Sequence, residues 1–405
     1  MNTPALHTDR WQWRARRERR GYLALQDGTI FRGHSVGAAR ECVGEAVFNT
    51  GMTGYQEMLS DPSYAGQFVA LTCPEIGNVG MNDADMESRR LFAAGLLLHA
   101  SNEPSNWRSE RPLREALAAQ GIPALAGIDT RALTLLLREK GTQRAFLSAT
   151  GETPADEGVR RARAWEGLDG QDYAARVSCD APYAWDPDSR LTCSWGFAAT
   201  LPPADLAVVA YDFGIKWNIL RHLRRLGMRV TVVPARTSAA DVLALRPDGV
   251  LLSNGPADPA ALGYAVEAVR ALLGRVPVMG VCLGHQLLGL ALGGRTYRLP
   301  FGHHGCNHPV KDLATGRVEI TSQNHNYAVD AATLDPSAAE ITHLNLNDGT
   351  VEGLRARGAS AFSVQYHPEG APGPHDPAPL FQRFRDLMAR GSATRVSREA
   401  SGGPT

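Results

Sequence analysis

The sequence predicts an α/β protein with a mostly parallel sheet in its C-terminal half, preceded by a domain of mixed α+β structure. Two observations lead to this fold class. From residue 205 onward, strand-like and helix-like runs alternate, which is typical of a parallel sheet covered by helices on both faces. Before residue 200 the chain shows hairpin signals and isolated helices instead. Pro187, Pro202 and Pro203 lie among polar residues between the halves and indicate a linker.

These patterns divide the chain into four segments. We expect a disordered extension over residues 1–20, a mixed domain over 21–200, an α/β domain over 205–391 and a disordered tail over 392–405. The extension holds six arginines with Trp11 and Trp13 between them, as an RNA-binding arm or a targeting peptide would. Because it has no periodic apolar face, we favour a disordered extension or a start site assigned too far upstream.

Composition limits the function classes. The 42 basic residues balance the 42 acidic ones, so no overall charge favours nucleic acid or a membrane as a partner. The six cysteines form no CxxC pair, and no apolar run reaches membrane length. We therefore expect a cytoplasmic protein. The absence of a GxxxxGK[ST] motif excludes a P-loop.

The N-terminal half begins with a predicted hairpin. Strand-like residues 22–25 and 29–31 flank Asp27-Gly28, a frequent two-residue hairpin turn. Further along, Asp129-Thr130 can cap a helix that ends near Lys140-Gly141. Its leucines at 133, 136 and 137 share one face, as a helix packed on a core requires.

The C-terminal half reads as a series of strands and helices. Strands are predicted over residues 207–211, 229–233, 249–252, 276–279, 318–321, 340–346, 351–354 and 361–365. Helices are predicted over 216–226, 260–273, 285–292 and 379–388. In such folds, ligands bind at the carboxyl ends of the parallel strands.

One of those strand ends carries the pentapeptide Gly280-Val281-Cys282-Leu283-Gly284. An apolar strand precedes it and a helix follows, which is the arrangement of a nucleophile elbow. The turn would lift Cys282 above the sheet at the N-terminus of a helix, where a thiolate is favoured. Since a thiolate attacks carbonyls, the position predicts acyl transfer through a thioester.

His367 and Glu369 are the predicted partners of Cys282. A thiolate needs a base that later protonates the leaving amine, and the base needs an orienting group. Both residues follow the strand at 361–365, and residues i and i+2 of an extended chain face the same way. His285 is nearer in sequence, but on the helix after the elbow it should point elsewhere.

The developing oxyanion needs hydrogen-bond donors. One is the N–H of Leu283, which directly follows the nucleophile. A second can come from the loop at residues 253–259, which follows the strand at 249–252.

Motifs in both halves carry a family resemblance. Ser253-Asn254-Gly255-Pro256, Cys282-Leu283-Gly284-His285-Gln286 and Tyr366-His367-Pro368-Glu369 resemble the class I, triad-type glutamine amidotransferases. The first half is similar to one branch, the carbamoyl-phosphate synthetase small subunits. Its matching motifs include Phe48-Asn49-Thr50-Gly51-Met52-Thr53-Gly54-Tyr55-Gln56-Glu57, Asp61-Pro62-Ser63-Tyr64, Asn82-Asp83-Ala84-Asp85 and Ile128-Asp129-Thr130-Arg131. With Tyr211-Asp212-Phe213-Gly214 and the following Lys216, the motifs cover nearly everything between Tyr22 and Arg390.

The resemblance implies a flavodoxin-like amidotransferase domain and a role for each matching residue. Cys282 would be the nucleophile, His367 the base and Glu369 the orienting carboxylate. The amide site would be lined by Gly255, Ala257 and Leu283. The backbone end of glutamine would be held by Gln286, Asn324, Asn326 and Tyr327, with Gly51 contributed by the first domain.

The resemblance also implies the partners. The chain would hydrolyse glutamine and pass ammonia to a large subunit, which would use ATP and Mg²⁺ to make carbamoyl phosphate from bicarbonate for pyrimidine and arginine biosynthesis. No cofactor is expected in this chain. The alternative is a structural or regulatory subunit with an impaired glutaminase, whose large subunit uses free ammonia.

Four pocket positions depart from the family. Gly51 replaces a usual serine, Ala257 and Asn326 replace glycines, and Tyr327 replaces phenylalanine. The lost hydroxyl would remove a hydrogen bond of about 1 kcal/mol. If position 257 required positive φ, alanine would cost roughly 1–2 kcal/mol. We therefore expect an active site with a raised KM for glutamine.

A group of potential metal ligands remains: His303, His304, Cys306 and His308. Their spacing fits neither of the usual paired patterns of zinc sites. The related sequences carry the histidines without a metal role and have glycine in place of the cysteine. We therefore predict no metal site.

Overall fold

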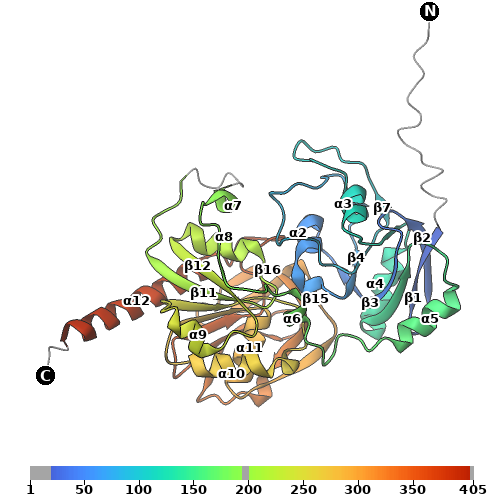
Figure 1. Cartoon of the computed structure of the whole chain (residues 1–405). Coiled ribbons are helices and arrows are strands. Elements are labelled where there is room, and N and C mark those ends of the chain that lie inside the picture. Colours follow the sequence, from blue (N-terminus) through green and yellow to red (C-terminus); the bar gives the residue numbers. More distant parts are fainter. Residues whose placement is uncertain (1–19, 194–199, 402–405) are drawn as a thin grey trace, which may run out of the picture. The chain divides into compact units, whose positions relative to one another are not determined.

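The structure is a computed structural model that describes residues 20–193 and 200–401 (Figure 1). The predicted disordered extension therefore lies outside the described residues except for Arg20. The chain forms two compact units. The first comprises the residues up to Asn49 with Gly66–Asn82 and Ala93–Gly167, and the second comprises Thr50–Ala65, Asp83–Phe92 and the chain from Leu168 onward.

The first unit is built on a closed barrel. Its strand order within the described residues is β1 (Arg20–Leu25), β2 (Ile30–Ser35), β8 (Ala124–Ala126), β6 (Gly95–Leu97), β4 (Gln67–Leu71), β3 (Glu41–Asn49) and β9 (Gln143–Ser148), which returns to β1. The expected hairpin is present, because β1 pairs antiparallel with β2 across a turn in which Gly28 has φ 101°. Only glycine adopts such an angle without strain.

Helices α3 (Leu113–Ala119), α4 (Thr130–Lys140) and α5 (Ala155–Ala164) complete this unit, together with the short pair β5 (Glu75–Ile76) and β7 (Ala100–Ser101). Helix α4 confirms the predicted helix. The Asp129 carboxylate caps it by accepting from the N–H of Ala132 at 2.8 Å, and Gly141 ends it with φ 83°.

The second unit contains a sheet of ten strands in the described part of the chain. Five of them run parallel in the spatial order β12 (Met228–Pro234), β11 (Leu206–Asp212), β13 (Gly249–Leu252), β14 (Val278–Val281) and β19 (Ala361–Val364). Numbered along the chain, this order is 2-1-3-4-5, that of flavodoxin-like folds. The expected fold class is confirmed.

Helices cover both faces of this parallel region. Side chains of α9 (Ala239–Ala244), α10 (Gly263–Leu272) and α11 (Leu283–Ala291) pack with Val209 and Tyr211. Side chains of α8 (Trp217–Arg225) and the first turns of α12 pack instead with Val208 and Ala210. Alternate residues of β11 thus face opposite cores, which accounts for its continuous apolar sequence.

Antiparallel strands extend the sheet. Strand β10 (Tyr183–Ala184) lies beside β12, and beyond β19 follow β18 (Val351–Ala356), β17 (Ala339–Asn345), β15 (Arg295–Asp312) and β16 (Val318–Asp330). Strand β16 is much longer than the predicted strand at 318–321, since polar residues such as Gln323 and Asn324 continue it. Short 3₁₀ turns η3 (Pro259–Ala261) and η4 (Ala331–Thr333) complete this part.

The unit boundaries differ from the predicted contiguous domains 21–200 and 205–391. Two loops of the N-terminal half, with α2 (Tyr55–Ser60) and η2 (Pro62–Tyr64), belong to the second unit. So do α6 (Tyr173–Val177) and α7 (Arg190–Cys193). Helix α7 lies between Pro187 and Pro202, inside the predicted linker. These loops are held by hydrogen bonds between residues distant in sequence, which local composition does not reveal.

Helix α12 (Pro379–Ser401) corrects the predicted C-terminal boundary. It continues past residue 388 and covers residues 392–401, where a disordered tail was expected. Two alanines, two arginines and one glutamate in this stretch favour helix. Residues 402–405 of the expected tail lie outside the described residues. Among the described helices, none is both long and apolar enough to cross a membrane.

Candidate active site

Cys282 lies in the sharp turn between β14 and α11. Its φ and ψ are 54° and −106°, a strained conformation for a residue with a side chain. A Cβ at Gly280 would lie 2.6 Å from the carbonyl oxygen of Gly284, and a Cβ at Gly284 would lie 2.2 Å from that of Leu252. Both glycines are therefore required by close backbone packing, and the predicted elbow is confirmed.

The thiol of Cys282 is buried, with 2% of the residue exposed. Its Sγ lies 3.6 Å from the carbonyl oxygen of Asn324 on β16. The N–H of Gly284 donates to the carbonyl of Ser253 and ties α11 to the loop after β13. Among the described residues, no backbone carbonyl accepts from the N–H of Leu283. This N–H is therefore available as an oxyanion donor at the helix N-terminus.

His367 and Glu369 follow β19, and both are buried. The Nδ1 of His367 lies 2.7 Å from Oε1 of Glu369, while its backbone N–H donates to the carbonyl of Ser322. A carboxylate only accepts, so the proton is on Nδ1 and the ring orientation is fixed. Within the described chain, the buried Nε2 makes no hydrogen bond of standard geometry. It is thus the nitrogen available for proton transfer.

Electrostatics couple His367 to both of its neighbours. Burial by itself would lower the pKa of this imidazole. The negative charge of Glu369, that of the Cys282 thiolate, and hydrogen bonds to both outweigh burial and raise the pKa to about 10. His367 is therefore held in its protonated form by its surroundings.

Lys216 is a second partner of Glu369. Its Nζ lies 2.8 Å from Oε1, and both side chains are almost fully buried. Burial would raise the pKa of Glu369, but the charges of Lys216 and His367 hold it well below its usual range. Lys216 was part of a matching motif without an assigned role. It is one of only three lysines in an arginine-rich chain, which was the available signal.

Glu87 and Arg221 form a further buried ion pair, which interacts with Lys216. The Glu87 carboxylate accepts from Arg221 at 3.2 Å, and the charges of Glu87 and Lys216 act on each other. Burial raises the pKa of Glu87 to about 7, although the charges of Lys216 and Arg221 lower it. Basic and acidic side chains thus alternate from Arg221 through Glu87, Lys216 and Glu369 to His367. We call this series the charge row.

Gln286 and three residues of β16 are brought together by hydrogen bonds. The Nε2 of Gln286 donates to the carbonyl of Tyr327 at 2.7 Å. The His304 ring lies 3.0 Å from the side-chain oxygens of both Asn324 and Asn326. The predicted substrate residues of this group therefore form two hydrogen-bonded sets that meet on β16.

The backbone of the loop after β13 bears on the conformational energy cost that was considered for Ala257. Among the described non-glycine residues, positive φ occurs at Asp186, Ser189, Arg246 and Cys282, so Ala257 is not in the left-handed region. The penalty considered for alanine there is absent. Gly255 does need to be glycine, because a Cβ would lie 2.0 Å from the carbonyl oxygen of Phe213.

Comparisons with known proteins identify the chain's relatives. The family "Glutamine amidotransferase class-I" matches residues 209–387, and "Carbamoyl-phosphate synthase small chain, CPSase domain" matches residues 23–147. A carbamoyl phosphate synthase small chain from Xanthomonas axonopodis pv. citri is 52% identical over 384 residues, covering 91% of this chain and 98% of the relative. One from Ralstonia nicotianae is 52% identical over 371 residues, covering 91% and 97%. A chloroplastic one from Oryza sativa subsp. japonica is 50% identical over 367 residues, covering 90% and 81%.

The chain belongs to the carbamoyl-phosphate synthase small-chain family. It is the glutamine-hydrolysing subunit of that enzyme, and the alternative of a purely structural subunit is not favoured. Among solved structures, a glutamine amidotransferase from Thermotoga maritima covers 48% of this chain and 86% of its own, at 17% identity with a TM-score of 0.32. The assignment therefore depends on the sequence relatives.

In this small chain, Gly51 and Tyr327 have well-defined surroundings. Gly51 is buried next to Thr50, whose N–H donates to the carbonyl of His304 at 3.2 Å. The hydroxyl of Tyr327, which the usual phenylalanine lacks, contacts Asp169 and Arg298.

The sequence reasoning missed Asp61 and Ser63, although both lie in a matching motif. The side-chain amide of Asn254, directly before Gly255, donates to the hydroxyl of Ser63 at 2.9 Å and to Asp61 at 3.2 Å. His285, considered as an alternative base, has its Nδ1 2.9 Å from the Ser363 hydroxyl, and burial lowers its pKa to about 3.

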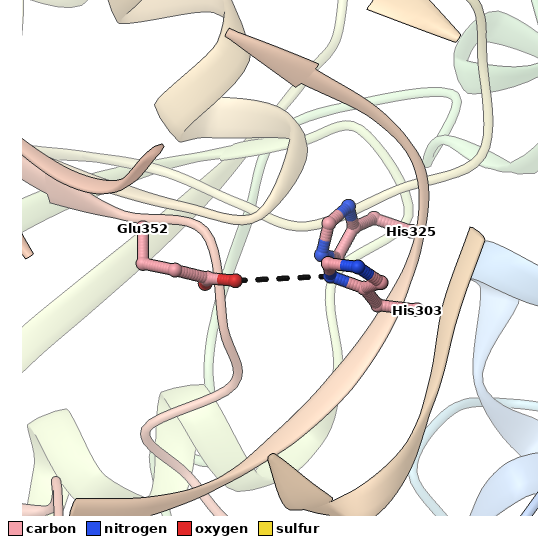
Figure 2. A group of neighbouring side chains, drawn as sticks. All are labelled: His303, His325 and Glu352. Atoms are coloured by element: carbon pink, nitrogen blue, oxygen red, sulfur yellow. Dashed lines mark ion pairs between the residues drawn. The ribbon is translucent and has the colours of Figure 1, made fainter. Parts of the chain in front are cut away.

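Figure 2 shows the one group of described residues whose side-chain atoms lie close enough together to bind a metal ion: His303, His325 and Glu352. It differs from the group considered in the sequence, since His304 contacts the two asparagines and Cys306 lies by Ser322. The ligand atoms lie within 4.8 Å of one another.

Most of these ligand atoms already have partners. His325 lies 2.8 Å from the carbonyl of Tyr327 and 2.9 Å from Oε1 of Gln323. The two oxygens of Glu352 accept from Asn345 at 2.9 Å and from Gln323 at 3.0 Å. These contacts join His325 and Glu352 in one hydrogen-bond network through Gln323.

His303 supplies the positive charge of this network. It lies between Asp348 at 2.8 Å and Glu352 at 3.8 Å. Burial would lower its pKa, but the two carboxylates raise it to about 9. An imidazolium thus balances carboxylates that would otherwise attract a cation.

Proposed function

We propose that Cys282, His367 and Glu369 hydrolyse glutamine through a glutamyl thioester. The observation that carries this proposal is the pairing of His367 Nδ1 with Glu369, which leaves Nε2 available beside a thiol on a strained elbow. The Cys282 thiolate attacks the side-chain amide carbon of glutamine. His367 donates its Nε2 proton to the departing nitrogen, and ammonia leaves.

Water completes the reaction. His367, now neutral, removes a proton from a water molecule that attacks the thioester carbon. The C–S bond breaks, and the products are glutamate and the thiolate, with His367 again protonated. In both steps the N–H groups of Leu283 and Gly255 stabilise the oxyanion, each donor being worth about 3 kcal/mol of barrier.

The remaining pocket residues hold glutamine. Leu283, Gly255 and Ala257 line the amide end. The backbone end is bound by Gln286, Asn324, Asn326 and Tyr327, with Gly51 nearby. The hydrogen bonds that join Gln286 to Tyr327 and Asn324 to Asn326 through His304 support this division.

The ammonia is consumed by a partner. A large subunit binds ATP and Mg²⁺ and converts bicarbonate to carbamoyl phosphate for pyrimidine and arginine biosynthesis, and this chain binds no cofactor. Enclosing the ammonia between subunits prevents its loss to water and protonation. The complex is cytoplasmic. The six cysteines, all within described residues and all free, support a reducing compartment.

The test uses the chain co-purified with its large subunit. Cys282→Ser should abolish carbamoyl phosphate formation from glutamine and leave formation from ammonium, because the latter chemistry takes place on the large subunit. A glutamine-like chloroketone should label the wild type at Cys282. Glutamine-dependent synthesis that survives in Cys282→Ser would contradict the mechanism. A wild type active only with ammonium would favour the structural-subunit alternative.

A further inference from the structure

Asp61 is a buried carboxylate close to Cys282 that the proposed reaction does not use. It is 3% exposed and lies at the start of η2, where Oδ1 accepts from the N–H of Ser63 at 2.9 Å. This bond caps the short helix. A cap needs only one acceptor, however, and the carboxylate has two oxygens engaged.

The other contacts of Asp61 reach both sides of the elbow. Its Oδ1 accepts from Nδ2 of Asn254 at 3.2 Å, and its Oδ2 accepts from Nδ2 of Asn324 at 2.8 Å. Asn254 immediately precedes Gly255 in the loop after β13. Asn324 lies on β16, and its carbonyl oxygen is 3.6 Å from the Sγ of Cys282. One carboxylate thus connects the two backbone segments that flank the nucleophile.

A carboxylate accepts hydrogen bonds and cannot donate them, which sets the orientation of both amides. Asn254 must turn its NH₂ toward Asp61, so its Oδ1 faces and accepts from the N–H of Lys216 at 3.1 Å. Asn324 must do the same, so its Oδ1 faces Nδ1 of His304 at 3.0 Å.

The orientation then reaches His304. Burial lowers the pKa of this histidine to about 4, so the ring is neutral and carries one N–H. Because Oδ1 of Asn324 can only accept, that proton lies on Nδ1. The acceptor character of Asp61 thereby sets the tautomer of His304.

We propose that Asp61 is a positioning residue of the glutaminase site, which orients Asn254 and Asn324 and, through Asn324, sets the tautomer of His304. The proposal depends on the glutaminase mechanism above and assigns no bond-making step to Asp61. It explains why a charged carboxylate, and not merely a capping residue, occupies this buried position.

Asp61→Asn separates positioning from capping. Asparagine has the same size and is an equally good cap, so the bond to Ser63 is kept. It has one acceptor oxygen fewer. With that oxygen kept at the cap, where it also accepts from Asn254, its NH₂ would face the NH₂ of Asn324. This conflict forces the Asn324 amide to rotate or leaves a buried donor without a partner.

Asp330→Asn is the matched control. Asp330 also caps a 3₁₀ turn, η4, by accepting from the N–H of Ala332 at 3.0 Å. It lies at the end of β16, the strand that carries Asn324, and its side chain has no role in the proposed mechanism.

Both variants are measured as complexes with the large subunit. We expect Asp61→Asn to lower kcat/KM for glutamine by about 10- to 100-fold, while ammonium-dependent synthesis and the thermal midpoint stay near those of Asp330→Asn. Inactivation by a glutamine-like chloroketone should slow in parallel. Alkylation of Cys282 by iodoacetamide, which needs no amide pocket, should keep its wild-type rate.

Two outcomes would overturn the positioning role. Wild-type glutamine kinetics in Asp61→Asn would show that the amide orientations do not matter. A large fall in thermal midpoint, with equal changes in both alkylation rates, would reduce Asp61 to a structural role. If the wild-type complex itself failed to use glutamine, the glutaminase mechanism would fail first, so the two failures are distinguishable.

Discussion

At the scale of single residues, the backbone of Cys282 is the most constrained feature of the site. A conformation of this kind costs of order 1–3 kcal/mol and persists only where packing enforces it. Here the enforcement comes from Gly280 and Gly284, which allow β14, α11 and the loop after β13 to approach closely. The conformation of Cys282 thus depends on two nearby residues without side chains.

Gly284→Ala should therefore damage both folding and catalysis. The added methyl would meet the backbone of Leu252 at 2.2 Å, and backbone cannot move aside as a flexible side chain can. We expect a loss of about 1–3 kcal/mol in the free energy of unfolding, measured in urea, together with a strongly reduced glutaminase rate.

Gly263→Ala provides the control for that experiment. This glycine begins α10, and nothing lies within 4 Å of the position of its Cβ. Its substitution should leave stability unchanged or raise it by about 0.5 kcal/mol. An unfolding midpoint for Gly284→Ala equal to that of Gly263→Ala would contradict the close-packing argument.

At the scale of elements, β15 and the β17–β18 hairpin are joined by charge as well as by strand pairing. His303 on β15 contacts Asp348 in the hairpin turn and Glu352 on β18. Glu352 accepts from Gln323, and the Oε1 of Gln323 lies beside His325. His325 in turn lies beside the carbonyl of Tyr327, which also accepts from Gln286. The antiparallel extension of the sheet is thereby linked to Gln286 on α11.

The stability supplied by His303 should depend on pH. Its pKa is raised from 6.5 to about 9 in the folded chain, so the folded state binds the proton more tightly than the unfolded state. The contribution is fully present below pH 6.5, where it amounts to at most about 3 kcal/mol. It is lost as the pH rises through 9.

Urea unfolding of the wild type and His303→Gln at several pH values tests this dependence. The stability difference between them should be largest near pH 6 and should shrink toward zero by pH 10. A difference that stays constant or grows over this range would exclude the ion pairs as its source.

At the scale of the whole chain, the two compact units are interleaved in sequence. Thr50–Ala65 and Asp83–Phe92 come from the N-terminal half but belong to the second unit. They bring Asp61 and Glu87 to it, and both carboxylates are buried there. The amidotransferase unit is thus incomplete without segments that lie far upstream of its matching region.

A fragment that starts at residue 205 should therefore not fold as the intact chain does. Arg221 would lose Glu87, and Asn254 and Asn324 would lose Asp61, leaving buried polar groups unpaired. We expect no cooperative thermal transition by circular dichroism, in contrast to the full chain. A fragment with a sharp transition and chloroketone-reactive Cys282 would show that the upstream segments are dispensable.

Separation along the sequence decides which features of the site could be predicted. The elbow was predictable because strand, glycines, cysteine and helix are contiguous, and His367 with Glu369 because they are two residues apart. Lys216 and Asp61 could not be assigned a role, since their partners Glu369 and Asn324 are 153 and 263 residues away. The cost expected at Ala257 was wrong because it assumed a backbone conformation that the loop does not adopt.

The charge row has a consequence for redesigning this enzyme. Its side chains are buried away from water. Replacing one of them by a neutral residue therefore leaves its partner as a buried charge without a counter-ion. Mutant libraries that change one position at a time would therefore contain mainly destabilised variants at these positions. Paired neutral replacement of Glu87 and Arg221 removes one acidic and one basic group together. It should therefore disturb the buried pair of Lys216 and Glu369 less than replacing either residue alone.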